Sequence, residues 1–206
     1  MLIWHIATTI CDYKTPLQDG TVLDENQLVA TTLSYYCSYL LFYVTELVME
    51  NFHSTQLFLQ DLQVNAQQCL VGCRSKDAIL ERLSCLKKGD KADKADKYKD
   101  RADKKGDKAD KYKDILAGGA KLADQLMQEL PDKAARWELL AEVWVEKLIS
   151  VTPSNNLTAH TNRLATGGEY ITHLWVWLTH KGVLEPPLLF GGGGPVRTAM
   201  RAEELV

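Results

Sequence analysis

The sequence lacks the paired cysteines that build a disulfide framework or a zinc ribbon. Its five cysteines are an odd number, and no two of them are arranged as C-x-x-C. A reducing compartment is the simplest environment for such a chain. The N-terminus, MLIWHIATTICD, lacks the basic region of a signal peptide, and His5 interrupts its apolar run. We therefore expect a protein that is cytoplasmic or peripheral to a membrane.

Familiar catalytic and phosphate-binding motifs are also missing. The chain has no G-x-S-x-G, no Walker-type loop, no H-E-x-x-H and no dinucleotide fingerprint. The four glycines at 191–194 are followed by neither a lysine nor a helix start, so they are typical of a linker rather than of a phosphate loop. These absences argue against enzymatic activity and predict neither a metal nor another cofactor.

Positive charge is scarce outside one segment. Residues 87–114 hold 12 of the 24 basic residues and 8 of the 27 acidic ones, so the segment carries +4 and the rest of the chain −7. A mildly acidic globular part disfavours a nucleic-acid partner, and interleaved aspartates cancel much of the segment's own field. The expected partner is therefore an unknown protein or a membrane surface.

Long apolar runs are scarce as well, although 46% of the 206 residues are hydrophobic and one domain with a real core is expected. Residues 28–49, LVATTLSYYCSYLLFYVTELVM, contain a single charge, Glu46, and have the length that a bilayer core requires. Their many hydroxyl groups and the missing cationic flank favour a buried core helix. An integral span through 28–49 is the alternative.

Apolar periodicity predicts a helical chain. We expect helices over residues 2–11, from a capping box at Asp24 and Gln27 through 49, over 54–70 and from Arg74 onwards. A further helix follows Pro131, and its apolar stripe consists of Trp137, Leu140, Ala141, Trp144 and Leu148. The glutamates Glu138, Glu142 and Glu146 lie mostly away from that stripe. Residues 151–162 are predicted to be a polar loop.

The lysine-rich segment 87–114 is an internal duplication, in which ADKYKD recurs after a shift of 14 residues. Aspartates lie four residues before lysines, a spacing that stabilises helices weakly. A thin stripe that ends at Tyr112 also runs on into the following sequence, through Leu116, Ala123, Leu126 and Leu130. The segment is predicted to be a long solvated helix, broken near Gly106, or a disordered insert.

Together these patterns predict an all-α protein, a loose helical bundle of about five or six helices. Its core is expected where residues 1–50 pack on the two Trp-rich helices. We divide the chain into an N-terminal helical part (1–86), the Lys/Asp-rich insert (87–114), the C-terminal Trp-rich helices that complete the bundle (115–182) and a flexible tail (183–206).

The stretch TGGEYITHLWVWLTH, residues 166–180, holds the most chemistry-bearing side chains. Glu169, His173 and His180 fall near one side of a helix, but the two histidines are about 10 Å apart along its axis, too far to share one ion. Thr166 and Glu169 are spaced as a capping box, and Gly167 and Gly168 allow a tight turn. The remaining positions form a core stripe of Ile171, Leu174, Trp175 and Leu178. We therefore expect structural roles here.

Several stretches resemble a plant family defined by domains of unknown function 4220 and 594. They are IWHIATTIC at the start, WELLAEVWVEKL at 137–148 and GGEYITHLWVWLTHKG at 167–182, with LSYYCSYLLFYV at 33–44 between the first two. The resemblance implies a helical C-terminal region of a membrane-associated family, here truncated. It supplies no catalytic residue. The motif residues expected to be structural are Trp4, His5, Trp137, Glu138, Trp144, Glu146, Gly167, Gly168, Glu169, His173, Trp175 and His180.

The leading functional hypothesis is a non-enzymatic interaction or scaffold domain. One alternative is a metal-binding or hydrolytic enzyme that uses Glu169 and His173, with His5 brought near by folding. A second alternative is a stress-related protectant or tether that acts through the charged helix of residues 87–114.

Overall fold

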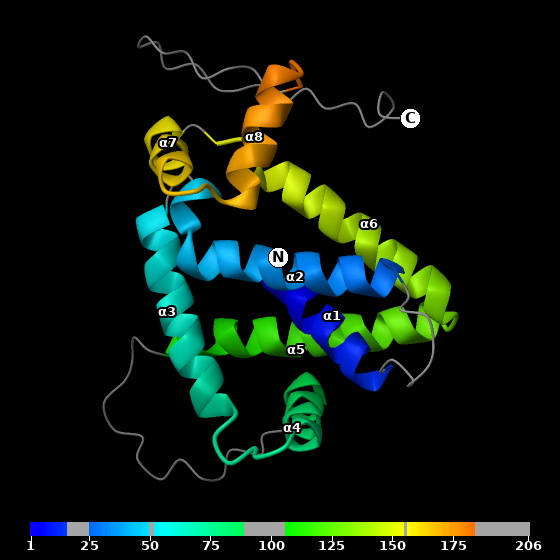
Figure 1. Cartoon of the computed structure of the whole chain (residues 1–206). Coiled ribbons are helices and arrows are strands. Elements are labelled where there is room, and N and C mark those ends of the chain that lie inside the picture. Colours follow the sequence, from blue (N-terminus) through cyan, green and yellow to red (C-terminus); the bar gives the residue numbers. More distant parts are fainter. Residues whose placement is uncertain (16–24, 50–51, 89–105, 155, 184–206) are drawn as a thin grey trace.

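The computed structural model describes residues 1–15, 25–49, 52–88, 106–154 and 156–183 (Figure 1). These residues form eight α-helices and one 3-10 helix, and they contain no strand, which confirms the all-α prediction. The elements are α1 (Leu2–Lys14), α2 (Glu25–Tyr43), η1 (Thr45–Leu47), α3 (Phe52–Cys69), α4 (Lys76–Lys88), α5 (Gly106–Glu129), α6 (Lys133–Val151), α7 (Leu157–Ala165) and α8 (Tyr170–His180).

The core lies where α1 and α2 meet α5 and α6. Helix α2 packs chiefly on α6, as expected from the Trp stripe, and Trp137 and Trp144 are fully buried there. Helix α1 packs chiefly on α5 rather than on a Trp-rich helix, and Figure 1 shows it crossing between α2 and α5. The expectation that residues 1–50 pack on the two Trp-rich helices holds for α2 on α6, whereas the packing of α1 on α5 was not predicted.

Close approach of α1 to α5 depends on Gly119, the second of two adjacent glycines in α5. A methyl group on Gly119 would lie about where the Ile6 side chain packs, and it would also press on the backbone oxygen of Ile3. The same group on Gly118 would meet only the tip of Ile3 at an ordinary 3.4 Å. Glycine lowers helix propensity, so its presence inside α5 reflects packing rather than local preference.

Most of the stripe that runs on from the lysine-rich segment is buried. Tyr112, Leu116, Ala123 and Leu126 lie in the core, whereas Leu130 is half-buried. Helix α5 begins at Gly106, and the predicted break there stays a prediction because the residues before it lie outside the described ones. Residues 89–105, predicted to be helical or disordered, lie outside the described residues, as does the predicted flexible tail from 184 onwards. The fourfold division of the chain stays a prediction.

Two sequence predictions about helices are wrong. Residues 157–162 of the supposed polar loop belong to α7, because the side chain of Asn156 caps its N-terminus by accepting a hydrogen bond from the Ala159 amide at 3.1 Å. Residues 28–49 are not one helix: α2 ends at Tyr43 and the chain turns through η1. Within the described residues, no helix has the length and apolar character needed to cross a bilayer.

The predicted capping box at the start of α2 is not formed by Gln27. Its side-chain amide instead donates a hydrogen bond to Asp12 of α1 at 2.7 Å, and Gln27 is buried. Asp24, the other half of the predicted box, lies outside the described residues. Gln27 therefore joins two helices rather than closing the end of one.

Candidate interaction surface

Glu169 does not close a capping box with Thr166. Thr166 ends α7, whereas Glu169 is the residue before α8 and its side chain makes no capping hydrogen bond. Gly167 and Gly168 adopt φ values of +106° and +79°, so the chain turns between the helices in a conformation that favours glycine. This turn points the Glu169 carboxylate at α2, where it accepts a hydrogen bond from the Tyr39 hydroxyl at 2.9 Å.

A second contact fixes the start of α8 on α2. The Ile171 amide, one of the unpaired donors of the first turn, donates to the Tyr36 hydroxyl oxygen at 2.9 Å. Burial raises the pKa of Tyr36 to about 12, and the hydrogen bond to Glu169 raises the pKa of Tyr39. Both phenols therefore stay protonated at neutral pH. The motif stretches 33–44 and 167–182 are therefore joined by two hydrogen bonds, Tyr39 to Glu169 and Ile171 to Tyr36.

Helix α7 is tied to η1, the short turn that follows α2, by contacts with Glu46. Arg163 donates to Glu46 at 2.9 Å, and the Asn156 side chain donates to the Glu46 backbone oxygen at 3.2 Å. The contact with Glu46 raises the pKa of Arg163. Glu46, which the sequence presented as the one charge of an apolar run, thus anchors α7.

His160 is the functional-looking side chain that sequence reasoning missed. It is fully buried, stacks on Trp175 with ring centroids 4.6 Å apart and shares a 3.2 Å hydrogen bond with Thr172. Burial lowers the pKa of His160, so the neutral imidazole is favoured. Within the described residues its Nε2 has no hydrogen-bond partner. The sequence signal that could have indicated a helix around His160 is Asn156, a preferred N-cap residue four positions earlier.

The N-terminal motif holds α1 against α6 and α2. Trp144 donates through Nε1 to the Thr8 hydroxyl at 2.9 Å in the buried core. The His5 Nδ1 lies 2.8 Å from the Ser34 hydroxyl, and burial lowers the pKa of His5. Trp4 is half-buried, whereas Glu138 and Glu146 are exposed as the stripe predicted. The four motif stretches of the sequence are thus joined by direct contacts.

The outer side of α8 carries an aromatic row. Tyr170, His173, Trp177 and His180, spaced 3, 4 and 3 residues apart, are all exposed, while Ile171, Thr172, Trp175 and Leu178 face the interior. The row continues onto α2, because Tyr170 packs edge-on against Tyr36, which is followed by stacked Tyr39 and Tyr43. We define the aromatic face as Tyr39, Tyr43, Tyr170, His173, Trp177 and His180.

The candidate metal ligands have separate surroundings. Glu169 is bonded to Tyr39, His5 to Ser34, and the His173 ring lies over Gly168, where a methyl group would collide with it. In the described ranges, no three His, Cys, Asp or Glu side chains gather in a group that could hold an ion. Folding does not give the Glu169 and His173 pair a third ligand there.

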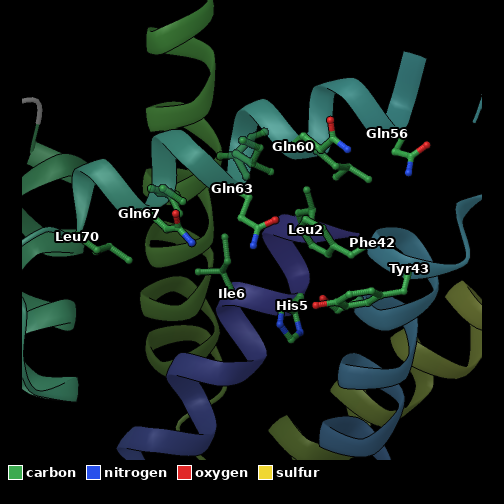
Figure 2. A pocket seen from close by; sticks show the side chains of 16 residues that line it. Leu2, His5, Ile6, Phe42, Tyr43, Gln56, Gln60, Gln63, Gln67 and Leu70 are labelled. Carbon is green, nitrogen blue, oxygen red and sulfur yellow. The ribbon is translucent and has the colours of Figure 1, made fainter. Parts of the chain in front are cut away.

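A groove of about 750 Å³ lies between α3 and the helices α1, α2 and α5. One side is a row of glutamines from α3, and Figure 2 shows the row running along the groove above α1. We define the glutamine groove by that row and the apolar side chains opposite: Gln56, Gln60, Gln63 and Gln67, with Leu2, Ile6, Phe42, Ile115 and Leu116.

Part of the chain matches a known family. Residues 129–183, which include α6, α7 and α8, match the family described as a protein of unknown function, DUF594. The match supports that part of the resemblance seen in the sequence. No curated protein and no solved structure matches the chain.

Proposed function

We propose that the chain is a non-enzymatic interaction domain that binds a protein partner through the aromatic face. The observation that carries the proposal is the set of large rings left in solvent beside a well-packed core: Tyr43 is 74% exposed, Tyr170 59% and Trp177 53%. Tyrosine and tryptophan are enriched at the energetic centres of interfaces, where they bury much area at low entropic cost.

The face is also held in place before binding. The Tyr39 hydroxyl donates a hydrogen bond to Glu169, and the Tyr36 ring packs edge-on against the Tyr170 ring. Rings that are already ordered lose little freedom on association, and affinity rises accordingly. The motif side chains Trp144 and His5 are used in contacts between helices, which supports the structural roles we propose for them.

The proposal extends to the setting that the resemblance implies, a plant protein derived from a membrane-associated family. A membrane surface also accepts exposed Trp and Tyr, but the aspartates and glutamates of the acidic bundle favour a protein partner over anionic lipid. The match over residues 129–183 is consistent with a domain that has no assigned chemistry.

The test is quantitative recovery of bound proteins from plant cell extract with the tagged full chain. Trp177→Ser removes the indole of the face, and Val145→Ser, which changes an exposed apolar residue of α6, is the matched control. We expect a defined set of proteins with the wild type and the control, reduced at least tenfold with Trp177→Ser. Equal recovery with all three, or substrate turnover that is lost in His173→Ala, would contradict the proposal.

A further inference from the structure

We propose that the glutamine groove binds an extended, uncharged peptide segment, whose backbone lies along the glutamine row and whose alternate side chains enter the apolar wall. Tyr43 is the one residue that the groove lining shares with the aromatic face, so this proposal does not depend on the proposed function. Nothing in the sequence pattern alone assigned a role to α3.

The glutamine row has the length and regularity of a recognition edge. Gln56, Gln60, Gln63 and Gln67 are spaced 4, 3 and 4 residues apart, which places them on one face of α3 over about 16 Å of helix axis. Each amide offers two donors and one acceptor oxygen. None of the four is hydrogen-bonded within the part of the chain that the structure describes, and all four are solvent-exposed.

The opposite side of the groove is largely apolar, and its polar side chains are His5, Ser38 and Tyr43. Leu2 and Ile6 of α1, Phe42 of α2, and Ile115 and Leu116 of α5 face the glutamines across it, and Figure 2 shows Leu2, Ile6 and Phe42 pointing toward the row. A groove of this volume is in the range of sites that enclose small ligands or short chain segments. Its occupant must therefore be apolar on one side and hydrogen-bonding on the other.

Charge restricts the occupant further. No Asp, Glu, Lys or Arg is among the described residues that line the groove. Its one imidazole, His5, is bonded to Ser34, and burial lowers the pKa of His5, so it carries no charge at neutral pH. A charged group brought into this lining would lose its water without gaining a counter-ion. An uncharged occupant matches the lining.

An extended polypeptide meets all of these conditions at once. Its backbone presents a donor and an acceptor at every residue, and its side chains alternate between two sides. At about 3.3 Å per residue, a 16 Å row accommodates about five residues. A lipid, in contrast, carries its polar groups at one end, so its acyl chain would displace water from the glutamine amides without replacing the lost hydrogen bonds.

The experiment selects from a phage library of random seven-residue peptides on the full chain. We expect enrichment of uncharged sequences in which apolar residues alternate, and saturable binding of a synthetic copy of the leading sequence. The double variant Gln60→Leu and Gln63→Leu is expected to bind that peptide at least tenfold more weakly. Gln68→Leu, which changes an exposed glutamine of α3 outside the groove lining, is the matched control.

A second arm keeps the test decisive where the double variant folds poorly. The selected peptide is resynthesised with alternate backbone amides N-methylated, and the wild type is expected to lose at least tenfold in affinity for it. Trp177→Ser should bind the unmodified peptide as the wild type does, which separates this site from the aromatic face. Absence of enrichment, selection of charged sequences, or equal binding of the methylated peptide would each overturn the proposal.

Discussion

The buried hydrogen bond between Trp144 and Thr8 ties α6 to α1 across 136 residues of sequence, and its removal should be costly. Thr8 and Thr9 form a matched pair, because each hydroxyl donates at 2.8 Å to the backbone oxygen four residues earlier. Only Thr8 also accepts from Trp144, and Thr8 is buried whereas Thr9 is exposed. The substitution Thr8→Val keeps the shape of the side chain and leaves the indole N–H without an acceptor.

An unsatisfied buried donor costs about 1–3 kcal/mol. Thr8→Val should therefore lower the free energy of unfolding by about that amount more than Thr9→Val, and Tm by roughly 2–12 °C for a chain of this size. The assay is urea unfolding followed by far-UV circular dichroism. In a Trp144→Phe background, which lacks the donor, the difference between the two valine variants should vanish. Equal stability of the single variants, or a difference that persists in that background, would refute the reasoning.

Three further outcomes follow from the packing, the buried histidines and the turn before α8. Gly119→Ala should destabilise the protein by about 1–3 kcal/mol, because its methyl group forces Ile6 to move. Gly118→Ala should be neutral or stabilising, because alanine has the higher helix propensity and the added methyl group fits. Thermal unfolding of the two variants checks both outcomes. Burial lowers the pKa of His5 and of His160 below the ordinary value of 6.5, so in acid the unfolded chain binds more protons than the folded one. The free energy of unfolding should therefore fall as pH drops below about 6.5. Measured by urea unfolding, this dependence on pH should be weaker in His160→Asn between about pH 7.5 and pH 5. Gly168→Ala should be destabilising because of its positive φ and the His173 ring, and His173→Ala should restore part of the loss in the same assay; full stability of the single variant would speak against the turn described above.

The core helices could be predicted from the sequence because their apolar spacing is long and regular. Trp137, Trp144 and Leu148 recur over about three turns of α6, and burial of that stripe follows from the pattern alone. The stripe from Tyr112 to Leu126 was predictable for the same reason. Helix α7 was not, because it is short and largely polar, and its stability depends on the Asn156 cap and on contacts with Glu46 that no local pattern reveals.

The role of Glu169 shows a second limit of sequence reasoning. The spacing of Thr166 and Glu169 fits a capping box, but two glycines with positive φ place Thr166 at the end of one helix and Glu169 at the start of the next. The tyrosine that binds Glu169 lies 130 residues away in the chain. Only the packing of α8 on α2 brings the partners together, just as only the packing of α1 and α5 gives the glutamine row an apolar wall.

The most direct test of the account compares Trp175 and Trp177, two residues apart on α8. Trp175 is 8% exposed and stacks on His160, whereas Trp177 belongs to the aromatic face. Trp175→Ser should cost about 3–5 kcal/mol of folding free energy. Trp177→Ser should leave stability within about 0.5 kcal/mol while partner recovery falls at least tenfold. Full recovery of the same proteins by a folded Trp177→Ser chain would contradict the central claim that this face binds the partner.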